Sequence, residues 1–191
     1  DVAYTQIGRS LELPTQAYLG MSDAKIVDAQ CGLESSAGNI LAALAGVNMV
    51  SGAGMMAFEN CQSFEKLVID ADVAGMAKHL SRGIQIHDDP IALDLIRDVS
   101  HESNFITHEH TYRWFKDEIY YPSPVIDRLS TEDWEDSGAL SCWDRANTLV
   151  DQLINCYQEP ILDQATRDEL RLITTKAAQI YGMDKLPPLS G

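Results

Sequence analysis

Residues 47–72, VNMVSGAGMMAFENCQSFEKLVIDAD, contain a short apolar run, a glycine turn and the start of a helix. Residues 52–57 match G-x-G-x-x-A, the pattern of a dinucleotide-binding loop, and Asp70 and Asp72 follow as candidate ribose contacts. That site needs a helix that begins inside the glycine pattern and a second strand that carries the acidic residue. Here the helix is predicted to begin near Ser63, no strand is expected between turn and helix, and both aspartates fall within the helix. We therefore interpret the glycines as a tight turn after a parallel strand, which either lines a ligand site or only closes the turn.

The segments around this turn alternate between strand-like and helix-like patterns. A β-compatible run follows Pro14, and Ser63 is placed to cap the helix after the glycine turn. Small and apolar residues recur at helical spacing between the two strand-like runs. The expected order is helix, strand, helix, strand and helix, over residues 2–11, 14–23, 28–45, 46–54 and 64–82. This alternation is typical of βα units in a parallel sheet.

Beyond residue 83 the pattern is helical. Prolines interrupt it, and Asp163 is placed to cap the last helix. The expected helices lie over residues 87–99, 107–119, 130–138, 141–157 and 162–183. The predicted fold class is therefore α/β, and mostly helical by residue count.

The composition excludes two classes of partner. A net charge of −15 over 191 residues comes without clusters of Lys and Arg, so no nucleic-acid partner is expected. No apolar run is long enough to span a membrane, and no signal peptide is recognised, so no membrane partner is expected either. The four cysteines form no C-x-x-C pair, which favours reduced thiols in a cytoplasmic protein. Because the chain opens on Asp1 at a predicted helix, we expect it to be the C-terminal portion of a longer protein.

Several linked segments resemble one known family. MSDAKIVDAQCGLE, LAALAGVNMVSGAGMM, SFEKLVIDADVAGMAKHLSRGI and FITHEHTYRWFKDEIYYPSPVIDR are similar, in this order, to the C-terminal part of the trimethylamine methyltransferase family. The resemblance covers residues 13–128. It implies a (β/α)8 TIM barrel that moves a methyl group from a methylated amine to the Co(I) of a corrinoid carried by a partner protein. It also implies that this chain binds no cofactor tightly, and we expect a homo-oligomer.

The resemblance also divides the chain. Residues 1–86 would be the last β/α units of the barrel, whose N-terminal half is missing. Residues 87–185 would be a helical extension packed on the barrel, and residues 186–191 a tail. We expect such a fragment to be inactive alone, because the catalytic groups of a barrel come from several strands.

The residue types narrow the expected substrate. Family members that act on trimethylamine itself carry pyrrolysine, and this chain has only standard residues, which favours quaternary amines such as glycine betaine. A quaternary ammonium that gives up a methyl group leaves as a neutral amine, so the protein mainly has to hold a cation in line. Aromatic faces and carboxylates do this best, and a betaine carboxylate would need its own Lys, Arg or N–H partner. The segment 54–63 departs from the family pattern, where Phe58 and Asn60 are expected to reshape the pocket.

The substrate-binding candidates lie mainly at the predicted strand ends. Asp23 could face the cation and Lys25 the substrate carboxylate, or they could be a turn residue and a solvated side chain. Gln30 and Glu34 are one helical turn apart and can share a face. We expect residues 22–25 and 51–54 to lie side by side on one edge of the sheet. The candidates are Asp23, Lys25, Gln30, Glu34, Ser51, Gly52, Gly54, His108 and His110, and no catalytic residue is assigned.

Three interpretations stay open at this point. His108 and His110 could close over the barrel mouth or be structural histidines, and their spacing on a helix does not favour a metal site. The whole chain could instead be a non-catalytic half-barrel and helical module that acts in assembly or docking, because a split barrel leaves strand edges and apolar helix faces unpaired. An unrelated barrel enzyme, such as a lyase, would turn over without a corrinoid.

Overall fold

The computed structural model describes residues 1–87, 92–99, 104–158, 160–183 and 185–186. The chain divides into two compact units, residues 1–155 and residues 156–191. Part of the expected helix 87–99, at residues 88–91, lies outside the described residues, as does most of the expected tail. The described helices are α1 (Val2–Ser10), α2 (Ala29–Ala45), α3 (Phe64–Ser81), α4 (Leu93–Asp98), α5 (Glu109–Glu118), α6 (Thr131–Asp136), α7 (Cys142–Asn155) and α8 (Gln164–Ile180). The strands are β1 (Gln16–Tyr18), β2 (Met49–Ser51), β3 (Met55–Met56) and β4 (Cys61–Gln62).

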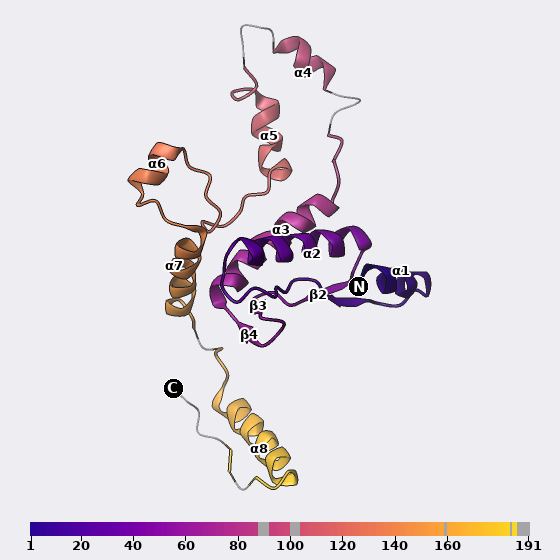
Figure 1. Cartoon of the computed structure of the whole chain (residues 1–191), viewed down its shortest axis with the longest axis vertical. Coiled ribbons are helices and arrows are strands. Elements are labelled where there is room, and N and C mark those ends of the chain that lie inside the picture. Colours follow the sequence, from indigo (N-terminus) through magenta and orange to yellow (C-terminus); the bar gives the residue numbers. More distant parts are fainter. Residues whose placement is uncertain (88–91, 100–103, 159, 184, 187–191) are drawn as a thin grey trace. The chain divides into compact units, whose positions relative to one another are not determined.

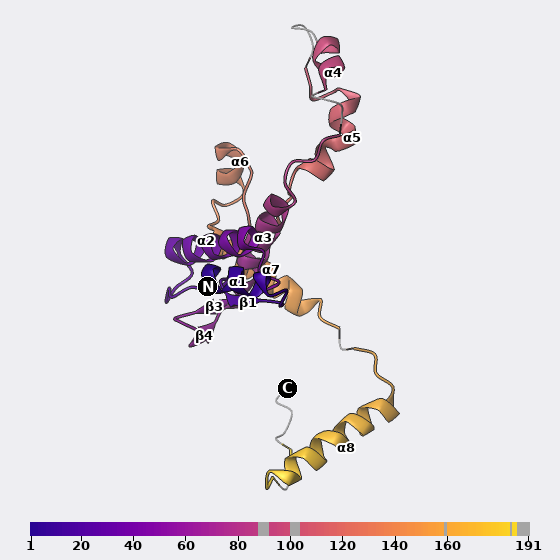
Figure 2. The same cartoon turned by 90° about the vertical axis from the view of Figure 1, so that its right-hand side faces the viewer.

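The predicted parallel sheet is confirmed for one βαβ unit. β1 pairs with β2 in parallel, from Gln16 opposite Met49 to Tyr18 opposite Ser51. α2 is the crossover between them, and it lies beside α3 (Figures 1 and 2). Helices dominate the described residues, as expected. Closure into a barrel stays a prediction, because β1 and β2 form a two-stranded sheet within the described part of the chain.

Helix ends follow the local capping signals. The side chain of Asp28 accepts hydrogen bonds from the amides of Gln30 and Cys31 at the start of α2. α2 ends at Gly46, whose φ of 74° is the left-handed conformation that favours glycine. The predicted cap at Ser63 is confirmed, since its hydroxyl accepts from the amide of Lys66. The expected cap at Asp163 is confirmed in the same way at α8.

The expectation of no strand between the glycine turn and α3 is wrong. β3 and β4 form a short antiparallel hairpin there. β3 is held against the segment after β1, because the Ser22 amide donates to the Met55 carbonyl (3.1 Å) and the Ala57 amide donates to the Ala24 carbonyl (3.0 Å). The hairpin tip, residues 57–59, has three non-glycine residues in succession at positive φ. That conformation is rare for such residues, so the sequence carries no ordinary turn signal here.

A second buried contact ties the segment after α5 to α3. The buried carboxylate of Asp72 accepts hydrogen bonds from the hydroxyl of Tyr120 (3.1 Å), and from the amide (2.9 Å) and hydroxyl (2.6 Å) of Ser123. Gly75 makes room for this ring, because a Cβ there would lie 2.1 Å from the Tyr120 oxygen. Asp72 therefore fixes residues 120–123 against α3.

Replacing Tyr120 with phenylalanine is expected to lower the free energy of unfolding by about 1–2 kcal/mol, because it removes a hydrogen bond to a carboxylate. Burial, and then Asp72, raise the pKa of Tyr120 above its ordinary value. A raised pKa in the folded state gives stability that is complete below the ordinary value and lost as the pH rises through the folded value. Urea unfolding at pH 7 and above pH 10 should therefore show a smaller alkaline loss in the variant. An equal loss in both proteins would contradict this assignment.

Candidate functional site

The segments that follow β1 and β2 lie in contact. The Gly20 amide donates to the Ser51 carbonyl (2.9 Å), and a Cβ at Gly52 would lie 2.7 Å from the Met21 nitrogen. Because the strands are parallel, both segments leave the same edge of the sheet. The expected juxtaposition is therefore present. We call residues 20–25 and 51–55 together the rim.

Glu34 joins three of its neighbours at the rim into one hydrogen-bond cluster. Its carboxylate accepts from the Ser22 hydroxyl (2.6 Å), the Asp23 amide (2.8 Å) and the Gln30 side chain (3.0 Å). These bonds, from Ser22 first and then from Gln30 and Asp23, hold the pKa of Glu34 below its ordinary value. The cluster thus keeps a fixed negative charge at the rim. Three of the candidates, Asp23, Gln30 and Glu34, meet here.

Replacing Ser22 with alanine is expected to raise the pKa of Glu34 toward its ordinary value, because it removes the largest cause of the depression. A depressed pKa in the folded state gives stability that is present above the ordinary value and lost as the pH falls through the folded value. The variant should therefore lose less stability between about pH 5 and 3 than the native chain. An NMR titration of the Glu34 carboxyl carbon measures the shift directly. An unchanged titration curve would show that the hydroxyl does not control this charge.

Lys25 and Asp23 add an exposed pair of opposite charges to the rim. The Lys25 ammonium lies 2.9 Å from the Asp23 carboxylate and also donates to the Asp23 carbonyl. Both side chains are largely exposed, so the pair contributes little to stability. The rim therefore presents one cation beside two carboxylates, those of Asp23 and Glu34.

A buried ion pair from α3 lies beneath the rim. The Lys66 ammonium donates to the Gly20 carbonyl (3.0 Å) and the Ser35 hydroxyl (2.8 Å), and it pairs with the carboxylate of Asp70. The same Asp70 oxygen accepts from the Gly54 amide (2.8 Å). The side chains of the pair are 0% and 1% exposed. α3 thus reaches both turns of the rim from below.

Sequence reasoning missed the role of this pair. The glycine pattern marked Asp70 only as a candidate ribose contact, and it gave Lys66 no role. The available signal was a Lys and an Asp four residues apart, which lie on one helix face. Their neighbours Leu67 and Val68 are apolar, a pattern that fits a paired charge on a helix that packs against the rest of the chain.

The backbone conformation explains why glycines occupy this turn. Gly52 and Gly54 have φ values of 104° and 79°, which strongly favour glycine, and both are buried. A Cβ at either position would also crowd a neighbour, Met21 for Gly52 and Leu67 or Gln62 for Gly54. The turn therefore requires both glycines whether or not a ligand approaches them. Contact of Ser51, Gly52 and Gly54 with a substrate stays a prediction.

The two histidine candidates begin α5. The His108 ring nitrogen accepts from the His110 amide (3.1 Å), so His108 caps its own helix. Within the described residues, no three His, Cys, Asp or Glu side chains gather as a metal site would require. Whether these histidines close over the rim stays a prediction.

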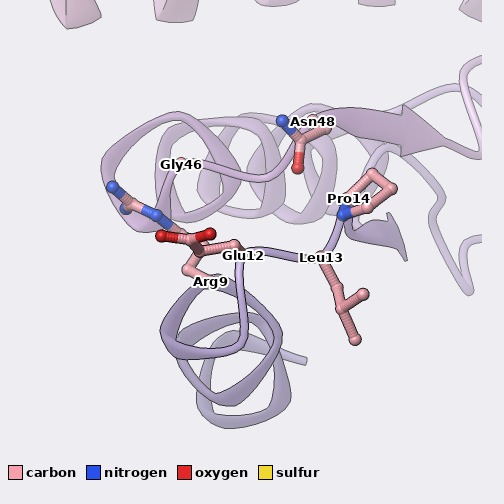
Figure 3. A pocket seen from close by; sticks show the side chains of 6 residues that line it. All are labelled: Arg9, Glu12, Leu13, Pro14, Gly46 and Asn48. Atoms are coloured by element: carbon pink, nitrogen blue, oxygen red, sulfur yellow. The ribbon is translucent and has the colours of Figure 1, made fainter.

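One hollow lies at the other end of the sheet. Figure 3 shows it between α1, the end of α2 and the segments that enter β1 and β2. Its lining residues include Pro14 and Asn48, which precede the two strands, whereas the rim follows them. Arg9 at its wall donates to the Ala45 carbonyl (2.8 Å), the last residue of α2, as a helix-end contact. Ligands of parallel α/β sheets bind at the carboxyl ends of the strands, so the rim is the better candidate.

The chain belongs to the trimethylamine methyltransferase (MTTB) family, which it matches over residues 1–180. It is 34% identical over 181 residues to a glycine betaine methyltransferase of Desulfitobacterium hafniense strain Y51, covering 94% of this chain and 37% of that protein. It is 30% identical over 183 residues to the trimethylamine methyltransferase MttB of D. hafniense strain DSM 10664 / DCB-2, covering 96% and 36%. It is 33% identical over 183 residues to the trimethylamine methyltransferase MttB2 of Methanosarcina mazei, covering 95% and 36%.

These matches confirm the resemblance seen in the sequence. The chain spans little more than a third of the length of these relatives. Among the described residues, no helix is both long and apolar enough to cross a lipid bilayer.

Proposed function

We propose that the protein carrying this chain moves a methyl group from a methylated amine, most suitably a quaternary one, to the Co(I) of a corrinoid protein. Membership in the family and the names of its relatives, which act on trimethylamine or glycine betaine, support the reaction class. The observation that carries the assignment of a site is the rim, where Glu34 holds a charge at the carboxyl ends of two parallel strands. We further propose a cytoplasmic homo-oligomer.

The rim offers the charge that this chemistry needs. The carbon–nitrogen bond breaks, its electron pair stays on the nitrogen, and the amine leaves neutral, so no proton has to move. Co(I) supplies the electron pair for the new bond to carbon. A quaternary ammonium has no N–H group, so it is recognised by charge and by aromatic faces rather than by hydrogen bonds. Glu34, held ionised by Ser22, Gln30 and Asp23, can attract such a cation without being a catalytic acid.

The opposite charges of the rim favour a zwitterionic substrate. Glycine betaine carries an ammonium and a carboxylate a few atoms apart. Glu34 would face the ammonium, and Lys25, which is exposed and bonded only to Asp23 in the described contacts, would face the carboxylate. Lys25 therefore gives a physical basis for a preference for betaines over amines without a carboxylate.

The decisive assay mixes the native full-length protein with a corrinoid protein, a Co(I)-generating reductant and one amine at a time. We expect loss of the Co(I) absorbance with glycine betaine, and less with tetramethylammonium. Lys25→Ala should raise the KM for glycine betaine about three- to tenfold and leave that for tetramethylammonium unchanged. Glu34→Gln should raise both, and Glu135→Gln on the exposed face of α6 serves as a matched control.

The competing function is assembly or docking without catalysis. It is favoured by apolar side chains that remain exposed on α2, namely Leu33, Ile40, Leu41 and Leu44. No methyl transfer with any amine of the panel would favour this function. Turnover without a corrinoid would favour a different reaction within this family.

A further inference from the structure

The buried pair Lys66–Asp70 connects the two turns of the rim to one helix. Lys66 bonds the Gly20 carbonyl of the first turn, and Asp70 bonds the Gly54 amide of the second. The two side chains are four residues apart on α3 and pair with each other. The two turns also bond each other directly, through the Gly20 amide and the Ser51 carbonyl. The pair therefore adds one rigid element, α3, that holds both turns from the same side.

Lys66 also contacts residues near both partners of the Ser22–Glu34 hydrogen bond. Gly20 is two residues before Ser22, whose hydroxyl donates to Glu34. Ser35, the second partner of Lys66, is next to Glu34 in α2. The same ammonium thus bonds a backbone carbonyl two residues before Ser22 and a side-chain hydroxyl one residue after Glu34.

Stability alone is a poor explanation for two charges at this depth. Removing an ion pair from water costs about as much as the pair regains, and apolar residues of similar size are often equally stable. One oxygen of Asp70 also accepts no hydrogen bond from any described residue, so the carboxylate is not fully satisfied. An apolar pair could not form the directional hydrogen bonds to the Gly20 carbonyl and the Gly54 amide of the rim.

We propose that Lys66 and Asp70 are positioning residues, which hold the Gly20 and Gly54 turns so that Glu34 faces the amine at a fixed place. The expected effect of the pair on methyl transfer rests on the proposed function. Its expected effect on the structure of the rim does not. A displacement of about 1 Å at a reacting group can cost about 100-fold in rate. The pair would therefore act on the reaction through the rim, without contacting substrate.

The test compares two charge-free double variants of the native full-length protein. Lys66→Met with Asp70→Leu removes every bond that the pair makes to the turns and leaves no unpaired charge. Lys66→Met with Asp70→Asn keeps a side-chain oxygen that can accept from the Gly54 amide. We expect hydrogen exchange at the Gly54 amide to accelerate about tenfold or more in the leucine variant and to be partly restored in the asparagine variant. We expect kcat for methyl transfer to fall about 100-fold in the leucine variant.

The control replaces a surface ion pair of the same spacing, Glu109 and Arg113, with glutamines. This control variant should change neither the hydrogen exchange at the Gly54 amide nor kcat. If the leucine variant does not fold, the asparagine variant alone decides, because its exchange and kcat can both be measured against the native protein.

The two readouts separate the inference from the proposed function. Native exchange at Gly54 in a folded leucine variant would overturn the positioning role, whatever the activity. Faster exchange with native kcat would also overturn it. The leucine variant could show faster exchange while even the native protein transfers no methyl group. That result would support the structural role of the pair and refute the proposed function instead.

Discussion

Lys66→Met is expected to lower the free energy of unfolding by about 3–5 kcal/mol, the range found when one partner of a buried ion pair is removed. Methionine fills a similar volume, so the loss comes from charge and hydrogen bonding and not from a cavity. It would leave the carboxylate of Asp70, which is 1% exposed, without its cation. It would also leave the Gly20 carbonyl without its Lys66 donor. The loss is therefore among the largest expected for any single substitution in this chain.

Urea unfolding followed by circular dichroism at pH 7 measures this loss. The matched control is Arg113→Met, which breaks an ion pair of the same spacing whose side chains are 58% and 78% exposed. Exposed pairs contribute about 0–1 kcal/mol, so the control should change little. Adding Asp70→Leu to Lys66→Met should recover much of the lost stability, because no charge is then left unpaired. A loss below about 1 kcal/mol for Lys66→Met would contradict the burial of the pair.

Gly38→Ala is expected to destabilise the chain by about 3 kcal/mol, although alanine is the better helix former. A Cβ at Gly38 would lie 1.7 Å from the carbonyl oxygen of Leu19 and 2.8 Å from its carbonyl carbon. Both atoms belong to the backbone directly after β1, so no side-chain rotation can relieve the overlap. α2 or the rim would have to move. This contact is what brings α2 within reach of Ser22.

Gly32→Ala is the matched control, because Gly32 lies in the same helix and a Cβ there would meet nothing within 4 Å. Its expected effect has the opposite sign, a gain of up to about 1 kcal/mol from helix propensity. Thermal unfolding of both variants should therefore move the midpoint in opposite directions. Equal shifts would show that α2 does not pack against Leu19 as closely as described.

Local signals determined much of this protein without the fold. The helix starts at Ser63 and Asp163 and the strand after Pro14 depend on residues only a few positions apart, and each was predicted from sequence. The order of strand, helix and strand was enough to predict that β1 and β2 pair in parallel. Linked segments sufficed for the family, which the comparison over residues 1–180 confirms.

Contacts between distant residues decided the rest. Lys66 meets a carbonyl 46 residues away, and Asp72 meets an amide 51 residues away. The sequence does not show whether a charged residue faces water or a partner inside the core. The burial of Lys66 and Asp72 could therefore be known only from the tertiary structure. The β3–β4 hairpin is of the same kind, because its tip at residues 57–59 takes positive φ against local preference while β3 bonds to the segment after β1. Periodicity and capping act within a few residues and can be read from sequence, and the order of the strands then places the two turns of the rim side by side. The buried bonds from α3 to these turns join residues far apart in the chain, so only the folded structure shows them.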